Sequence, residues 1–236
     1  MIKAVFFDWF NTLAHYEPPR EELQSQALSE SGIDIPPQKI IRGLAVADRE
    51  FFEENTISPI RKRDPEEQAK VYTRYQRTIL TESGVDVSTQ PEILPRVMQR
   101  VRELSRGMRF VLFGDVLPTV STLKERKLTL GLLTNLDREM KSICHDLGLE
   151  PYLDFIITSG EVGEDKPKPP IFLVALERAR VEASEAVHIG DQYKVDVLGA
   201  RGVGINALLL DRHDLYTEVS DCPRIRSLTE VTQYLK

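Results

Sequence analysis

Five short apolar runs recur along the chain, separated by polar turns and by longer segments of helical period. They cover residues 2–7, 128–133, 155–157, 187–189 and 205–210. Their hydrophobicity is continuous rather than alternating, which indicates strands that are buried on both faces, as in a parallel sheet. Amphipathic helical patterns precede each of the last four runs, at residues 116–126, 138–147, 170–180 and 195–202. This alternation predicts an α/β fold with a doubly wound parallel sheet and helices on both of its faces.

The long segment after the first run has a different character. Residues 15–108 are highly charged and helical in period, and no strand pattern interrupts them. Helices are predicted at residues 21–31, 37–54, 65–83 and 91–105. Turn signals such as Ser31-Gly32 and Ser83-Gly84 separate them. We therefore predict that residues 1–14 and 110–236 form an α/β core domain and that residues 15–109 form an inserted, all-helical cap domain.

Composition narrows the class of protein. The length of 236 residues allows one substantial core and a second, smaller unit. The net charge is −6, and the basic residues 61–63 are followed at once by acidic ones, so we expect no nucleic-acid partner. The first apolar run is too short for a signal peptide or a membrane span, and Cys144 and Cys222 lack metal-ligand spacing. A cytoplasmic protein without a membrane partner is expected, either a monomer or a homodimer.

Polar residues stand where the predicted strands end. In chain order they are Asp8, Thr134 with Asn135, Lys166, and Asp191 with Asp196. Ligands of doubly wound sheets bind beyond the carboxyl ends of the strands, so these groups are expected to converge on one site. His188 lies inside the fourth apolar run and is interpreted as a packed core residue.

These segments resemble the four sequence motifs of the haloacid dehalogenase superfamily, and the helical insert resembles the first type of cap in that superfamily. The most specific matches are the run Lys-Pro-x-Pro-x-x-Phe that begins at Lys166 and the pattern Gly-Asp-x-x-x-x-Asp that ends at Asp196. The resemblance covers essentially the whole chain. It implies a hydrolase in which Asp8 is the covalent nucleophile and attacks phosphorus or carbon to form an aspartyl intermediate.

The resemblance also implies how a substrate is held. Thr134 would donate a hydrogen bond to an anionic oxygen, and Lys166 would orient the nucleophile and stabilise charge in the transition state. Asn135, Phe10 and Asn11 are the other residues expected to contact substrate. The substrate itself is expected to be a small anionic metabolite, and a phosphomonoester is favoured.

A metal ion is implied as well. Mg²⁺ would be held by the carboxylates of Asp8 and Asp191 together with the backbone carbonyl of Phe10, since it prefers oxygen ligands. Asp196 would reach the metal through water or anchor Lys166.

Phe10 departs from the pattern of the phosphatases. They usually carry a second aspartate two residues after the nucleophile, which protonates the leaving group and then activates water. Phenylalanine cannot transfer a proton, so this function is missing unless Asn11, His15 or a cap residue supplies it.

Dehalogenation is accordingly an alternative activity. The 2-haloacid dehalogenases of this superfamily tolerate a non-acidic aromatic at this position, because a halide leaves without a proton. They use no metal, however, and usually lack an aspartate in the position of Asp191. Their cap supplies an arginine, for which Arg42, Arg20 and Arg49 are candidates here.

Two further alternatives remain. Phosphonate cleavage would require a cap lysine as a Schiff base, and Lys39, Lys62 and Lys70 lie in no recognised motif. A catalytically silent binding protein would fit Phe10, but it gives no reason to keep the acidic residues and the lysine together. We therefore predict a Mg²⁺-dependent phosphatase, with the other activities as alternatives.

Overall fold

The protein is represented by a computed structural model that describes residues 1–136 and 138–235. It divides into two compact units. One, which we call the core unit, comprises Met1–His15 and Phe110–Lys236; the other, the cap unit, comprises Tyr16–Arg109. The chain passes between the units within β2 (Ala14–Glu17) and β3 (Arg109–Leu112), which together form a two-stranded sheet.

The core unit contains a parallel sheet that, among the described residues, has six strands. Their order across the sheet is β5 (Phe155–Thr158), β4 (Thr129–Thr134), β1 (Ala4–Phe7), β6 (Ala186–Gly190), β7 (Asn206–Leu210) and β8 (Arg224–Ile225). Every adjacent pair is parallel. The predicted doubly wound α/β fold is therefore confirmed, and each of the five predicted apolar runs forms one of these strands.

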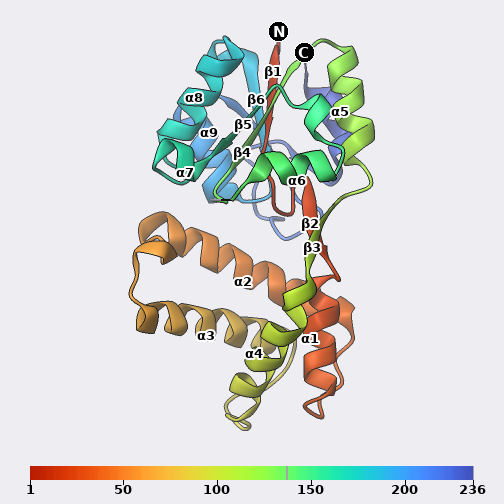
Figure 1. The fold of residues 1–236 in the computed structure, drawn as a ribbon, viewed down its shortest axis with the longest axis vertical. Helices are drawn as coiled ribbons and strands as arrows, with labels where there is room; N and C mark the ends of the chain where they lie inside the picture. The colour runs from red at the N-terminus through yellow and green to blue at the C-terminus, as the bar shows by residue number, and fades with distance from the viewer. Residues whose placement is uncertain (137, 236) are drawn as a thin grey trace. The chain divides into compact units, whose positions relative to one another are not determined.

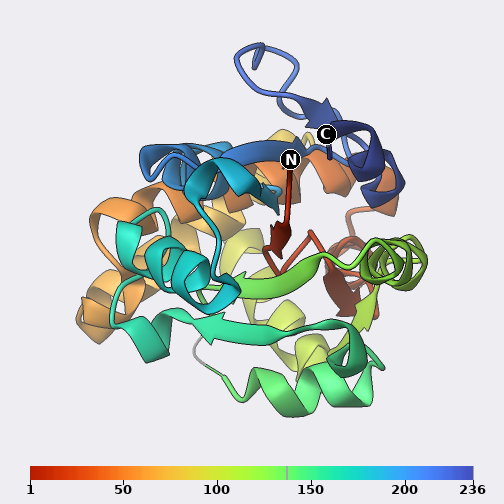
Figure 2. The same ribbon diagram turned by 90° about the horizontal axis from the view of Figure 1, so that it is seen from above.

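Helices cover both faces of this sheet. Because successive side chains of a strand point to opposite faces, β1 contributes Val5 and Phe7 to one core cluster and Ala4 and Phe6 to the other. The first cluster includes α5 (Val116–Glu125), α6 (Met140–Asp146) and η6 (Leu228–Tyr234). The second includes α8 (Pro169–Ala179) and α9 (Leu198–Gly202). Figures 1 and 2 show α5 (yellow-green) and α8 (cyan) on opposite sides of the strands. Shorter elements are η3 (Glu150–Tyr152), α7 (Ser159–Val162) and η4 (Ala183–Glu185).

The cap unit is built from four α-helices, as its periodicity predicts, and all of its residues are described. They are α1 (Arg20–Ser29), α2 (Pro37–Ile57), α3 (Pro65–Glu82) and α4 (Ile93–Leu104), with short turns at η1 (Ile60–Lys62) and η2 (Ser105–Gly107). The helices enclose a hydrophobic core of their own. None of the described helices combines the length and the apolar character needed to cross a lipid bilayer.

Three short strands and one irregular helix were not anticipated. The expectation that no strand interrupts residues 15–108 is wrong at β2, and β3 and β8 were not predicted either. Strands of two to four residues are too short to display an alternating pattern. The helix predicted at residues 195–202 is preceded by a π-helical turn, η5 (Tyr193–Val197), and only its second part is α9.

Candidate active site

The sheet places the ends of three strands side by side. The strand β1 lies between β4 and β6, and Phe7 is in register with Leu132 and Ile189. Asp8 therefore follows β1 at the same edge where β4 ends in Thr134 and β6 ends in Gly190. The Asp8 backbone N–H donates to the carbonyl of Ile189 at 2.9 Å, which continues the ladder by one residue and fixes the carboxylate at the strand end.

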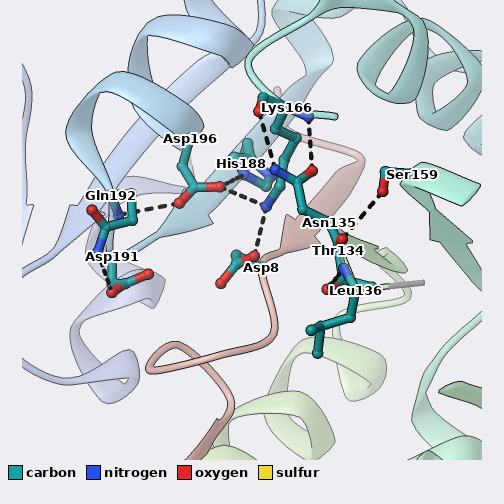
Figure 3. A network of polar contacts seen from close by, with 10 residues as sticks. All are labelled: Asp8, Thr134, Asn135, Leu136, Ser159, Lys166, His188, Asp191, Gln192 and Asp196. Carbon is teal, nitrogen blue, oxygen red and sulfur yellow. Dashed lines mark hydrogen bonds and ion pairs between the residues drawn. The ribbon is translucent and has the colours of Figure 1, made fainter. Parts of the chain in front are cut away.

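A buried lysine joins two carboxylates in this edge (Figure 3). The Lys166 Nζ donates to Oδ1 of Asp8 at 2.6 Å and to Oδ1 of Asp196 at 2.7 Å. The lysine and Asp196 side chains are each 1% exposed, whereas that of Asp8 is 13% exposed. Asp8 thus lies at the solvent side of the cluster, as a nucleophile that meets a substrate must.

Asn135 fixes the backbone that carries this lysine. Its amide Nδ2 donates to the carbonyl of Lys166 at 3.0 Å, and its Oδ1 accepts the N–H of Lys166 at 2.7 Å. Such a reciprocal pair leaves the Asn135 amide little freedom. The side chain therefore positions Lys166, and its predicted contact with substrate remains a prediction.

Thr134 lies buried at the end of β4. Its Oγ1 accepts the backbone N–H of Leu136 at 3.1 Å. A hydroxyl that accepts in this way still has its own hydrogen to donate. This chemistry agrees with the predicted hydrogen bond from Thr134 to an anionic oxygen.

Asp196 is held from three sides. Its Oδ1 accepts from Lys166 and from Nε2 of His188, at 3.0 Å in the second case, and its Oδ2 accepts the Gln192 backbone N–H at 3.1 Å. The turn η5 folds this carboxylate back against Gly190, where an added methyl group would overlap it. Glycine is therefore required beside Asp191, and the π-helical turn aims Asp196 at the lysine.

His188 has a role that the sequence interpretation missed. It is fully buried, and its ring lies edge-on to Phe172 with 5.3 Å between ring centroids. Because a carboxylate only accepts, its Nε2 carries the hydrogen that bonds to Asp196. His188 is thus a packed core residue, as expected, and also a hydrogen-bond partner of Asp196. The available signal was a polar residue inside an otherwise apolar strand.

Two other residues of the hydrogen-bond network, Gln192 and Tyr216, were not predicted from the sequence. Gln192 donates from Nε2 to Oδ2 of Asp191 at 2.9 Å, and Tyr216 donates its hydroxyl to Oε1 of Gln192 at 3.2 Å. Gln192 directly follows Asp191 in the sequence, which was a usable hint. Tyr216 lies 24 residues further along and gave none.

Burial and charge set the protonation of the cluster. Burial raises the pKa of Asp8 to about 6, and the charge of Lys166 limits that rise. Burial would lower the pKa of Lys166, but the charges of Asp196 and Asp8 outweigh it and hold the pKa above its usual range. Burial would also raise the pKa of Asp196, but Lys166 and His188 hold it well below its ordinary value. Burial lowers the pKa of His188, which favours the neutral form of its ring.

The cluster is suited to a divalent cation. Oxygens of Asp8, Asp191 and Asp196 lie within 4.8 Å of one another. Two of these carboxylates share the Lys166 ammonium, and the cluster holds an excess of acidic groups over that one ammonium. Such an excess is costly in a low-dielectric setting unless a cation offsets it. Asp196 already accepts hydrogen bonds from three donors. The residues best able to contact such an ion directly are therefore Asp8 and Asp191.

The loop after Asp8 is tightly folded. Asn11 adopts a left-handed conformation with φ of 60°, which asparagine tolerates better than most residues. The Phe10 ring is half-buried and lies edge-on to Phe110 with 6.5 Å between centroids. The His15 ring packs against that of Phe113 in a tilted arrangement, with 4.6 Å between centroids. The ring of Phe10 is therefore part of the packing of this loop, where the phosphatases have an acid.

Comparisons with known proteins agree with this geometry. A family model for haloacid dehalogenase-like hydrolases matches residues 2–204. Haloacid dehalogenase-like hydrolase domain-containing protein 3 of Danio rerio is 27% identical over 100% of this chain and 97% of its own. The ribulose-1,5-bisphosphate 5-phosphatase of Halopiger xanaduensis is 29% identical, over 89% of this chain and 85% of its own.

Solved structures give the same result for the fold. A HAD phosphatase from Thermococcus onnurineus has a TM-score of 0.58 and 26% identity, over 99% of this chain and 98% of its own. A 2-haloacid dehalogenase from Pseudomonas syringae has a TM-score of 0.57 and 25% identity, over 100% of this chain and 98% of its own. Overall similarity does not separate these two activities, because both proteins match about equally well. The family match and the residues at the strand ends agree, and the chain belongs to the haloacid dehalogenase-like hydrolases.

Proposed function

We propose that this hydrolase is a Mg²⁺-dependent phosphatase of a small phosphomonoester and that Asp8 is its nucleophile. The observation that carries the proposal is the charge of the site. Oxygens of three carboxylates lie within 4.8 Å of one another, two of these carboxylates contact one ammonium, and a phosphate dianion would add more negative charge beside them. Such a substrate can approach only when a cation offsets that charge, which favours a metal-dependent reaction.

The chemistry follows from the positions of the side chains. A carboxylate oxygen of Asp8 attacks phosphorus, the bond from phosphorus to the leaving oxygen breaks, and an aspartyl phosphate forms. Water then attacks phosphorus, and the bond from phosphorus to the Asp8 oxygen breaks, which restores the carboxylate and releases phosphate. The proton that water loses goes to the released phosphate or to solvent, and solvent protonates the leaving oxygen of the first step. Lys166 holds Asp8 in place and stays charged throughout, because two carboxylates raise its pKa. Bound Mg²⁺ would supply positive charge to the phosphoryl oxygens.

The relatives support a phosphate ester as the substrate. The Halopiger relative is a phosphatase of a sugar bisphosphate, and it aligns with 89% of this chain. Thr134, with a hydroxyl hydrogen left to donate, is suited to a phosphate oxygen. Which phosphomonoester is used is a further question that the cap residues would decide.

Dehalogenation is the second candidate, favoured by Phe10 alone. It requires an arginine for the halide and carboxylate, and two of the three cap candidates, Arg20 and Arg42, are poorly suited. Arg20 is already held by both oxygens of Asp48, at 2.9 and 2.6 Å. Arg42 is 74% exposed and pairs with Glu82 at 3.4 Å. Asp191 would also lack a purpose in a reaction that uses no metal.

Phosphonate cleavage has weaker support. A Schiff-base lysine needs burial or a neighbouring cation to lose its proton near neutral pH. Lys39, Lys62 and Lys70 are all exposed. A silent binding protein is disfavoured because a buried lysine between two carboxylates is costly to maintain without a use for it.

One experiment separates these activities. Turnover is measured with an aryl phosphate and with L-2-chloropropionate, each with Mg²⁺ and with EDTA, for the wild type and for Asp8→Asn. Mg²⁺-dependent phosphate release that the substitution abolishes supports the proposal. Chloride release that survives EDTA would overturn it in favour of dehalogenation. Phosphate release that Asp8→Asn retains would remove Asp8 as the nucleophile.

A further inference from the structure

A chain of buried hydrogen bonds runs from the loop after β7 to Asp191. Tyr216 is 6% exposed and Gln192 is 8% exposed. The Tyr216 hydroxyl donates to Oε1 of Gln192 at 3.2 Å, and Nε2 of Gln192 donates to Oδ2 of Asp191 at 2.9 Å (Figure 3 shows the second bond). This series of hydrogen bonds therefore ends on Asp191, one of the two carboxylates best able to contact a cation.

The orientation of the Gln192 amide is determined by chemistry. A carboxylate can only accept, so the group that faces Asp191 must be the NH₂. The amide oxygen then faces Tyr216, whose hydroxyl can donate. The tyrosine hydroxyl donates to the oxygen of this amide and so restrains the side chain from its far side. Tyr216 thus limits the movement of the Gln192 amide that holds Asp191.

The tyrosine is itself held in place. Asp211, which directly follows β7 and is 2% exposed, accepts the backbone N–H of Leu215 at 2.7 Å and that of Tyr216 at 3.0 Å. Arg224 donates to the same carboxylate at 3.1 Å. The Tyr216 side chain also packs in the second core cluster. A rigid loop therefore fixes the start of the hydrogen-bond chain.

We propose that Gln192 and Tyr216 are positioning residues that set the affinity of the site for Mg²⁺ by fixing the carboxylate of Asp191. This inference rests on the proposed metal-dependent function. Partners that hold a metal ligand in place typically change metal affinity by about 10–100-fold when they are removed. Neither residue need contact the substrate or the ion itself.

The test is a calorimetric titration of the full-length protein with Mg²⁺ alone, without substrate. Gln192→Met keeps the length of the side chain but removes its donor, and should weaken Mg²⁺ binding by about tenfold, the lower end of that range. Tyr216→Phe keeps the ring and should weaken binding by a smaller factor. The double variant should bind no more weakly than Gln192→Met, because Tyr216 acts through Gln192.

Two control variants complete the design. Tyr193→Phe removes a hydroxyl from the same region, but that hydroxyl bonds to Asp221 at 2.8 Å, so Mg²⁺ affinity should not change. Asp191→Asn should abolish binding. Circular dichroism establishes that each variant is folded. If Gln192→Met does not fold, the Mg²⁺ affinity of Tyr216→Phe alone tests the positioning role.

The outcomes distinguish the inference from the proposed function. If Asp191→Asn abolishes binding while Gln192→Met and Tyr216→Phe bind Mg²⁺ as tightly as the wild type, the positioning role is wrong and the metal site stands. Additive losses in the double variant would also overturn it. If the wild type binds no Mg²⁺, the proposed metal-dependent function and this inference both fail.

Discussion

Lys166 is the side chain on which the rest of the site depends. Its ammonium is 1% exposed and is stabilised by Asp8 and Asp196, so removing either carboxylate leaves a buried charge with one partner fewer. Asp196 in turn relies on His188 and on the Gln192 backbone. The carboxylate of Asp8, the proposed nucleophile, is thus oriented by a series of contacts that runs through Lys166 and Asp196 to His188.

The role of His188 can be tested by substitution. His188→Leu removes the N–H that bonds to Asp196, a hydrogen bond to a charged group worth roughly 1.5–3 kcal/mol of stability. Because Asp196 then holds Lys166 less firmly, kcat should fall, by up to about 10²-fold if the lysine shifts by about 1 Å. His188→Gln keeps a donor near the same place and should retain more of the activity. Equal losses of kcat in both variants, measured with an aryl phosphate, would contradict this role.

The consequence of Phe10 can be tested by restoring an acid. Phe10→Asp should raise kcat/KM for alkyl phosphates, whose leaving groups need a proton, toward the lower end of the roughly 10²–10⁴-fold that general acid catalysis contributes. The gain with an aryl phosphate should be smaller. Phe10→Asn loses the same ring contact with Phe110 but cannot transfer a proton, and is the matched control. A similar gain for both classes of substrate would argue against a missing acid.

Short elements, rather than long ones, determine how the site is assembled. The strand β6 ends at Gly190, and the π-helical turn η5 then returns Asp196 to the position beside it. Elsewhere in the core unit, Asp115, directly before α5, accepts from Arg212, Ser227 and the N–H of Leu228. This carboxylate ties α5 to the start of η6.

Because Asp196 packs closely against Gly190, adding a single methyl group at position 190 is predicted to reduce activity and stability severely. Gly190→Ala would overlap Cγ of Asp196, so the turn η5 must shift and Lys166 must lose a partner. Activity should fall by at least about 10²-fold, and the midpoint of thermal unfolding should drop. Gly202→Ala, where a methyl group meets nothing within 4 Å, is the control and should leave both quantities near the wild type. Wild-type activity in Gly190→Ala would contradict the described packing.

The hydrogen bonds and the ion pair that Asp115 accepts predict that the stability of the protein depends on pH. Burial would raise the pKa of Asp115, but Arg212 and the Leu228 N–H outweigh it and hold the pKa below its ordinary value. The stabilisation is therefore complete above the unfolded pKa of about 3.9 and is lost as pH falls through the lower folded value. Asp115→Asn should cost roughly 1.5–3 kcal/mol at pH 7 in denaturant unfolding. The difference from the wild type should shrink at lower pH.

The control for this prediction is Asp214→Asn, which removes an exposed partner of Arg226 and should change stability little. A difference between wild type and Asp115→Asn that stays constant from pH 7 to acid would contradict the predicted linkage.

The sequence was most informative about elements with a strong period and about residues at strand ends. The four cap helices could be predicted because each is long enough to display its period, and five strands of the sheet because each contains a continuous apolar run. The strands β2, β3 and β8 could not, since they have two to four residues. Asp8, Lys166 and Asp196 were predicted to converge because parallel strands end at a common edge. Tyr216 could not be found, because its contact with Gln192 depends on how the loop after β7 folds.

At the scale of the whole molecule, the chain combines two units with separate hydrophobic cores. The core unit holds the charged cluster that would perform the chemistry. The cap unit buries polar networks of its own, including the reciprocal amide pair of Gln24 and Gln76, with bonds of 3.0 and 2.8 Å. Such networks hold the cap helices in register.

The central claim is that Asp8 is the nucleophile of phosphoryl transfer, and it is tested most directly by trapping the intermediate. The protein is mixed with an aryl phosphate that carries a radioactive phosphoryl group, quenched in acid within one turnover, digested and mapped. The account predicts label on the peptide that contains Asp8, only when Mg²⁺ is present, and none in Asp8→Asn. Label on another residue, or phosphate release with no labelled protein at any quench time, would contradict it.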